Sequence, residues 1–304
     1  MERESRLFWE APPAPAPRVA AAPRFRLLHG ILLAATLLST TVAGALQAGV
    51  DPFADPAGLT RGLPFSLTLM CIVLVHEAGH YLMCLRYGVT ASLPYVLPGP
   101  PLPPLPGTFG AFIRIQSPFP DRRALFDVGA AGPWAGFVVA LIAMIVGLSR
   151  STVLPTAPDG GLVVLGDSFV MSALIRVVLH ADPATVVLGP VAYAGWFGFL
   201  ITALNLLPVG QLDGGHAVYA VARRWHRTLS YATIAGFVAF SAYQSIFLHA
   251  LPQYTLWIVI LWILRDRHPT LVDESSELGV ARTCIALLLL GIFIVAFVPR
   301  LFDL

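Results

Sequence analysis

Long apolar runs separated by short polar segments dominate this chain of 304 residues. The first two runs, 27–46 and 63–85, match the roughly 20 residues that an α-helix needs to cross a bilayer. Five more follow: 128–148, one starting near 186, 231–248, 254–264 and 280–298. The pattern predicts an all-α polytopic membrane protein with about seven spans, or six if the short run at 254–264 does not cross.

A different periodicity follows the second run. After a Pro-rich segment (94–106), apolar Phe109, Ala111, Ile113 and Ile115 alternate with other residues. A spacing of two residues is typical of a β-strand. Because the stretch from 108 to 116 is too short to span, we expect a short strand at the membrane edge.

Two later segments carry weaker local signals. Gly132 and Gly136, near the start of the third run, permit another helix to approach closely. Within 166–180, the apolar Phe169 and Val177 suggest an interfacial helix.

Helix-breaking residues interrupt the chain after the fourth run. Pro208, Gly210 and Gly214 lie within Asn205-Leu-Leu-Pro-Val-Gly-Gln-Leu-Asp-Gly-Gly-His216, and such residues end helices. Irregular backbone survives at membrane depth only inside protein or beside water. We therefore expect this segment to face an internal site.

The amino-terminal region differs in composition from the rest. Residues 1–25 are polar and rich in Ala and Pro, which predicts a disordered tail, with 26–304 forming one integral membrane domain. The run 27–46 is longer than a signal-peptide core, so we expect it to be retained. Ala43-Gly44-Ala45 resembles a cleavage site, which leaves removal as the alternative. The acidic residues and low Ser content of the tail argue against a transit peptide.

Composition narrows the class of protein. Hydrophobic residues make up 57% and charged residues 12% of the chain, and the mean hydropathy is +0.76. A soluble domain carries about twice that charged fraction. A net charge of +2 suggests no nucleic-acid partner. The three cysteines fall in apolar runs, so no disulfide framework is expected.

The distribution of arginine predicts an orientation. All 19 basic residues are Arg. With the amino terminus inside and seven crossings, 15 of them fall inside, and those outside are Arg61, Arg150, Arg176 and Arg300. We expect a cytoplasmic amino terminus and, with no transit peptide visible, a bacterial cytoplasmic membrane.

The second run contains the residues that are the strongest candidates for a metal and catalytic site: His76-Glu77-Ala-Gly-His80. Histidines four residues apart lie on one face of a helix and can bind one zinc ion, while the glutamate between them can act as general base. The motif also arises by chance, and a buried His-Glu pair can simply join helices. Three ionisable groups inside a span are costly, which favours a functional site.

A zinc hydrolase needs a third protein ligand and an open position. Of 17 acidic residues, only Glu77 and Asp213 lie at embedded positions. Asp213 is therefore the expected third ligand, and Glu77 stays free to move a proton.

Three further residues have open assignments. Asn205 could hold the substrate carbonyl or oxyanion, or it could cap backbone freed by Pro208. His216 could be an outer partner of the metal site or a proton carrier, or simply an interfacial histidine. Cys84 follows His80 by four residues and could compete as a ligand, but a small buried hydrophobe is the favoured role.

Together these motifs resemble the site-2 protease family of intramembrane zinc metalloproteases. The resemblance rests on His76-Glu-Ala-Gly-His80, on Asn205-x-x-Pro208-x-x-x-Leu-Asp213-Gly, and on the small residues of 129–136. The stretch 88–212 is especially similar to the bacterial and chloroplast branch that includes the ethylene-dependent gravitropism-deficient plastid proteases. The similarity covers about 62–225, the expected catalytic core.

The resemblance implies one zinc ion held by His76, His80 and Asp213, catalysis by Glu77, and cleavage of membrane-spanning protein substrates within the lipid bilayer. Two rival functions remain: a membrane metal-binding or transport protein, and an inactive relative of the proteases. Nothing in the sequence indicates the oligomeric state.

Overall fold

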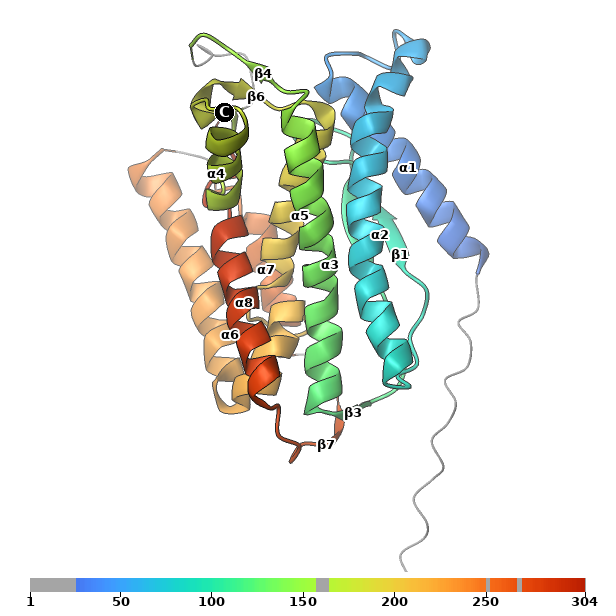
Figure 1. Ribbon diagram of the computed structural model, residues 1–304, viewed down its shortest axis with the longest axis vertical. Helices are drawn as coiled ribbons and strands as arrows, with labels where there is room; N and C mark the ends of the chain where they lie inside the picture. Colours follow the sequence, from blue (N-terminus) through green and yellow to red (C-terminus); the bar gives the residue numbers. More distant parts are fainter. Residues whose placement is uncertain (1–25, 157–163, 250–251, 267–269, 304) are drawn as a thin grey trace, which may run out of the picture.

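The computed structural model describes residues 26–156, 164–249, 252–266 and 270–303, which are mostly helical (Figure 1). The helices are α1 Leu27–Gln47, α2 Leu63–Arg86, α3 Arg122–Leu148, α4 Phe169–Val178, α5 Pro190–Asn205, α6 Asp213–Phe247, α7 Thr255–Leu264 and α8 Val280–Ala296. Short 3₁₀ helices are η1 Pro56–Gly62 and η2 Pro183–Thr185. The tail expected at 1–25 lies outside the described residues.

Short strands lie between the helices: β1 Tyr95–Pro98, β2 Thr108–Phe112, β3 Phe119–Asp121, β4 Thr152–Val153, β5 Val164–Leu165, β6 Val186–Val187, β7 Leu271–Asp273 and β8 Phe302–Asp303. They form the antiparallel pairs β1–β2, β4–β6 and β5–β8 and the parallel pair β3–β7. Figure 1 shows β3 and β7 at one end of the helical bundle, below called the lower end, and β4 and β6 at the opposite, upper end.

Three helical segments in the described part of the chain are long and apolar enough to cross a membrane: Leu27–Gln47, Pro56–Arg86 and Arg122–Leu148. The expectation of seven spans is not confirmed. Helices α5, α7 and α8 have 16, 10 and 17 residues, fewer than the roughly 20 that a perpendicular helix needs. The run expected at 231–248 is the second half of α6, a helix of 35 residues with non-helical backbone at Ala222.

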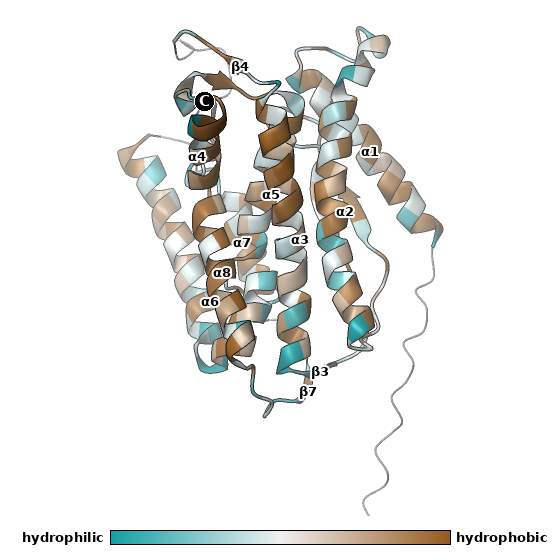
Figure 2. Ribbon diagram, in the orientation of Figure 1, coloured by the Kyte–Doolittle hydropathy of each residue, from teal (hydrophilic) through white to brown (hydrophobic). Residues whose placement is uncertain are grey.

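The outer surface of the bundle suits a bilayer. Large apolar side chains such as Leu67, Ile142 and Leu290 are more than half exposed. Figure 2 shows hydrophobic ribbon along the helices and hydrophilic ribbon gathered at the lower ends of α2, α3 and α6. A soluble monomer rarely exposes this much contiguous apolar surface. These features support association with a membrane.

The expected strand after α2 is present as one half of a hairpin. Strand β2 pairs with β1, with Phe112 opposite Tyr95, and it ends at Phe112 rather than at 116. Phe109 is 65% exposed. Gly110, whose φ of +89° departs from strand geometry, interrupts the alternation. It resumes at Ala111, since Ala111, Ile113 and Ile115 are half-buried and the residues between them are exposed.

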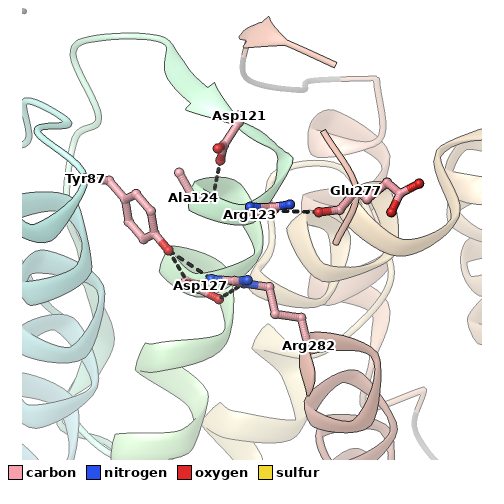
Figure 3. A network of polar contacts seen from close by, with 7 residues as sticks. All are labelled: Tyr87, Asp121, Arg123, Ala124, Asp127, Glu277 and Arg282. Atoms are coloured by element: carbon pink, nitrogen blue, oxygen red, sulfur yellow. Dashed lines mark hydrogen bonds and ion pairs between the residues drawn. The ribbon is translucent and has the colours of Figure 1, made fainter. Parts of the chain in front are cut away.

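A cluster of Tyr87, Asp127 and Arg282, the lower-end cluster, joins α2, α3 and α8 (Figure 3). Arg282 donates from Nε and Nη2 to the two carboxylate oxygens of Asp127, each at 2.8 Å. The Tyr87 hydroxyl donates to the same carboxylate. Burial, followed by the effect of Asp127, raises the pKa of Tyr87, so the phenol stays a donor. Charge-assisted bidentate pairs are strong, so this cluster ties α8 to α3.

Candidate metal centre

The two histidines and the glutamate of the sequence motif lie in the second half of α2. His76, Glu77 and His80 are each less than 7% exposed. Four residues of α-helix bring His80 onto the same face as His76. Their imidazole rings accordingly lie 4.8 Å apart between centroids.

Asp213 reaches this site because the helix breaks as expected. Helix α5 ends at Asn205 and α6 begins at Asp213. Between them, Gly210 has a φ of +52°, and a Cβ there would lie 1.9 Å from the carbonyl oxygen of Leu264. Only glycine fits this turn, which delivers the first residue of α6 to α2.

The three side chains converge. His76 Nε2 lies 3.2 Å from Asp213 Oδ2, and His80 Nε2 lies 3.3 Å from Asp213 Oδ1. The two Nε2 atoms are 3.1 Å apart. Among the described residues, this is the group of His, Cys, Asp and Glu side chains that could hold a metal ion.

These spacings fit zinc. Zinc sites in proteins are tetrahedral, with ligand bonds of about 2.0–2.2 Å, so neighbouring nitrogen and oxygen ligands lie about 3.3 Å apart. The His76–Asp213 and His80–Asp213 distances come close to that value through different oxygens of the carboxylate. With one ligand atom taken from each residue, the three atoms all lie within 4.8 Å of one another. Two neutral nitrogens and one carboxylate oxygen are also donor types that zinc accepts.

Helix α3 fixes the orientation of one histidine. The Nδ1 atom of His80 lies 2.7 Å from the carbonyl oxygen of Val128. A carbonyl only accepts, so Nδ1 carries the proton and Nε2 keeps its lone pair for a metal. Sequence reasoning missed Val128, because a backbone carbonyl leaves no signal in the side-chain pattern.

The small residues of α3 make room for the histidines themselves. A Cβ at Gly132 would lie 2.1 Å from His80 Nε2, and one at Gly136 would lie 2.9 Å from His76 Nδ1. The expected close approach at these glycines is confirmed. The side chains that occupy the space beside the two glycines are the candidate metal ligands His80 and His76.

The other candidates occupy different places. His216 is buried on α6, and its ring centroid lies 6.3 Å from that of Phe119 on β3. Asn205 is half-buried at the end of α5. Cys84 is fully buried among apolar side chains and lies outside the cluster of candidate ligands, as its favoured role required.

Glu77 has one backbone neighbour that the sequence did not reveal. The backbone of Ile113, just past β2, lies close to its carboxylate. The hairpin and α2 therefore meet at the glutamate. Since alternate residues of a strand direct their amides to the same side, Ala111 presents its amide toward the edge on which Glu77 lies.

Residues 64–249 match the sequence pattern of peptidase family M50. The chain belongs to this family. The match covers more than half of the protein and includes both the His-Glu-His segment and Asp213. It confirms the expected resemblance to the site-2 proteases.

Several plant proteins are similar to this M50 chain. The probable zinc metalloprotease EGY1, chloroplastic, of Arabidopsis thaliana is 39% identical over 176 residues, covering 55% of this chain and 30% of the plant protein. The probable zinc metalloprotease EGY2, chloroplastic, of the same plant is 27% identical over 243 residues, covering 78% and 41%. The likeness to the plastid branch is confirmed.

The matched region spans less than half the length of these two relatives. Their names place them in chloroplasts, which does not fit the expected bacterial membrane. No solved structure matches the chain.

Proposed function

We propose that this M50 protein is a zinc-dependent endopeptidase that cuts membrane-spanning segments of other proteins. The observation that carries the proposal is the meeting of His76, His80 and Asp213 beside Glu77 inside an apolar bundle. In this proposal the first three hold one zinc ion. The relatives' names, which describe probable zinc metalloproteases, support the choice of metal.

Bound zinc would supply a Lewis acid that activates water and polarises the peptide carbonyl. The protein's own contribution is proton transfer by Glu77. Its carboxylate takes a proton from the attacking water and then delivers one to the leaving amine. The backbone of Ile113 lies close to that carboxylate. Asn205 is the proposed donor to the developing oxyanion, and His216 a proposed outer partner of the site.

A substrate helix must unwind before attack, because its carbonyls are already hydrogen-bonded within the helix. The proposed receptor for the unwound segment is β2. Among the described residues this strand pairs with β1 alone, and an exposed strand edge can bind an extended peptide. The amide of Ala111 lies on the same side as Glu77, which favours this geometry.

Two rivals are tested by the same experiment. A membrane metal transporter would also bury His and Asp, and an inactive relative would keep the fold without cutting. We propose measuring zinc content, zinc uptake and cleavage of synthetic membrane-spanning peptides with wild type and Glu77→Gln in proteoliposomes.

The protease should bind about one zinc ion in both forms, with cleavage reduced about 10²–10⁴-fold in the variant. Zinc in both with cutting in neither would favour the inactive relative. Retained zinc transport by Glu77→Gln, without peptide cleavage, would favour the transporter. Wild type that binds no zinc after metal loading would refute the proposal.

The proposed orientation has the amino terminus and the lower end facing the compartment of synthesis. This would be the cytoplasm for a bacterial membrane, although the chloroplast relatives argue for a plastid membrane instead. The excess of arginine on the proposed inner side supports the orientation in either setting.

A further inference from the structure

The proposed ligand Asp213 follows a short irregular segment rather than lying in the middle of a helix. Residues 206–212 join α5 to α6, and Asp213 is the first residue of α6. We call 206–212 the ligand turn. The first residue of a helix has no partner for its amide within that helix. The position of Asp213 therefore depends on what holds the ligand turn.

Two side chains from farther along α6 contact the backbone of the ligand turn. Ser230 Oγ donates to the carbonyl oxygen of Pro208 at 3.1 Å. His226 Nε2 lies 3.4 Å from the carbonyl oxygen of Gly210. Carbonyl oxygens only accept, so both side chains act as donors. Both are buried, Ser230 completely, and Ser230 makes the shorter contact of the two.

The break in α6 makes these contacts possible. In an unbroken helix, His226 and Ser230 would lie about 20 and 26 Å beyond Asp213, at 1.5 Å per residue. The backbone at Ala222 is non-helical, with φ −139° and ψ 58°, and the chain changes direction there. The ring of Tyr219, before the break, packs against that of His226, after it, with centroids 5.4 Å apart. The second half of α6 thereby reaches the ligand turn.

Helix α3 supports the break from outside. Arg122, the first residue of α3, donates from Nε to the carbonyl oxygen of Ala220 at 3.0 Å, and its Nη2 donates to the same oxygen. The same helix supplies the Val128 carbonyl that orients His80. Helix α3 thus contacts one proposed ligand directly and also fixes the part of α6 that holds the turn to another.

The ligand turn and the start of α6 pack backbone against backbone. A Cβ at Gly214 would lie 2.0 Å from the carbonyl oxygen of Leu206, and one at Gly215 would lie 2.4 Å from that of Gly210. Side chains that could absorb a displacement are absent from these contacts. Movement of the ligand turn would therefore be passed on to Asp213.

We propose that Ser230 is a positioning residue of the metal centre. Through the Pro208 carbonyl it holds the ligand turn, and so keeps the Asp213 carboxylate within reach of His76 and His80. Zinc–ligand bonds fall in a narrow range of about 2.0–2.2 Å, so a small displacement of the carboxylate weakens metal binding. The proposal rests on the zinc site proposed above.

The test measures the metal site rather than peptide cleavage. Co²⁺ serves as a second probe beside Zn²⁺, because it binds the same types of ligand and its visible absorption depends on the coordination geometry. Ser230→Ala should lower zinc affinity about tenfold, the smaller of the losses typical when a group that orients a ligand is removed, and should change the cobalt spectrum. Ser230→Thr keeps the hydroxyl and should restore most of both.

Ser241→Ala is the matched control. Ser241 is also buried on α6, and its Oγ lacks a hydrogen-bond partner among the residues that the structure describes. This variant should keep the zinc affinity and the cobalt spectrum of wild type. Unfolding temperatures of the metal-free proteins show whether the lost hydroxyl only destabilises the fold. A lower unfolding temperature in Ser230→Ala, with unchanged zinc affinity and cobalt spectrum, would overturn the positioning role.

These measurements also separate this inference from the protease proposal. Wild type that binds cobalt but cuts no peptide, with a changed spectrum in Ser230→Ala, would support the positioning role although the protease function fails. Cleavage by wild type, with equal metal affinity and equal spectra in Ser230→Ala, would overturn the positioning role and leave the protease proposal standing. Wild type that binds neither metal would refute both.

Discussion

At the residue scale, the histidine beside Gly132 leaves no room for a larger residue at this position. The Cβ of Gly132→Ala would lie 2.1 Å from His80 Nε2, so α3 or the imidazole would have to move. Either movement displaces a proposed ligand. We expect zinc affinity to fall about 10–100-fold, as when groups that orient a ligand are lost, and proteolysis to fall with it. Metal content after dialysis against graded zinc buffers measures this.

The control for that prediction is Gly291→Ala on α8, where no atom from another part of the described structure lies within 4 Å of the new Cβ. Alanine is the better helix former by about 1 kcal/mol, so this variant should keep its zinc and be no less stable. Zinc binding by Gly132→Ala equal to that of wild type would show that the close contact has no functional consequence.

Ala111 provides a cleaner test of the β2 edge than its neighbour. Replacing Ile113 with Pro would change the backbone next to Glu77, mixing substrate binding with the placement of the general base. Ala111→Pro removes an amide on the same side, two residues farther away, and Pro is tolerated on edge strands. We expect an increased KM with normal zinc content. An unchanged KM would exclude pairing of substrate at this position.

At the scale of elements, the lower-end cluster fastens α8 to the helices that carry the motif. Arg282→Met removes two of the three donors to Asp127 and leaves the Tyr87 hydroxyl. The carboxylate stays partly buried, with its side chain 20% exposed. Losing a partner in such a pair costs about 1–3 kcal/mol. We expect a lower unfolding temperature in detergent, measured by loss of helical circular dichroism.

Arg223→Met is the comparison for Arg282. It breaks the ion pair between Arg223, whose side chain is 53% exposed, and Glu274, whose side chain is 43% exposed. Exposed pairs contribute about 0–1 kcal/mol to stability. Arg282→Met should therefore lower the unfolding temperature clearly more than Arg223→Met does. Equal unfolding temperatures would mean that the lower-end cluster adds no stability beyond that of a surface pair.

Elements whose signal is local were predictable from the sequence. The break between Asn205 and Asp213 follows from Pro208 and Gly210, and the first two apolar runs end within a residue or so of α1 and α2. Helix α3 begins at Arg122, six residues before its apolar run, because the Asp121 side chain accepts from the Ala124 amide at 2.7 Å (Figure 3). Hydropathy alone does not register a polar first turn.

What depends on tertiary contact could not be predicted. The metal ligands were found because the i, i+4 spacing fixes two of them and few embedded carboxylates remain for the third. The Val128 carbonyl and the Ile113 amide are backbone groups, whose positions depend on how α3 and the hairpin pack on α2. The span count is not confirmed for a related reason: apolar runs reveal composition, whereas α5 is apolar and largely buried inside the protein.

At the scale of the whole molecule, arginine residues are distributed unevenly between the two ends of the bundle. Helix α2 finishes with Arg86 and α3 starts with Arg122 at the lower end (Figure 1). Arg223 pairs with Glu274, next to β7, and so belongs to the same end. Arg150 follows α3 at the upper end. A membrane protein places such a positive end on the side of synthesis.

Cysteine labelling tests this orientation directly. The chain's own cysteines (Cys71, Cys84 and Cys284), which are free in the structure, are first replaced by Ala. Thr152→Cys in β4 then marks the upper end, and Glu277→Cys, next to β7, marks the lower end; both positions are exposed. In intact cells expressing the protein, a membrane-impermeant maleimide should label Thr152→Cys at once and Glu277→Cys only after permeabilisation. The reverse pattern would overturn the proposed orientation, because the end of the bundle that carries Arg86 and Arg122 would then lie outside.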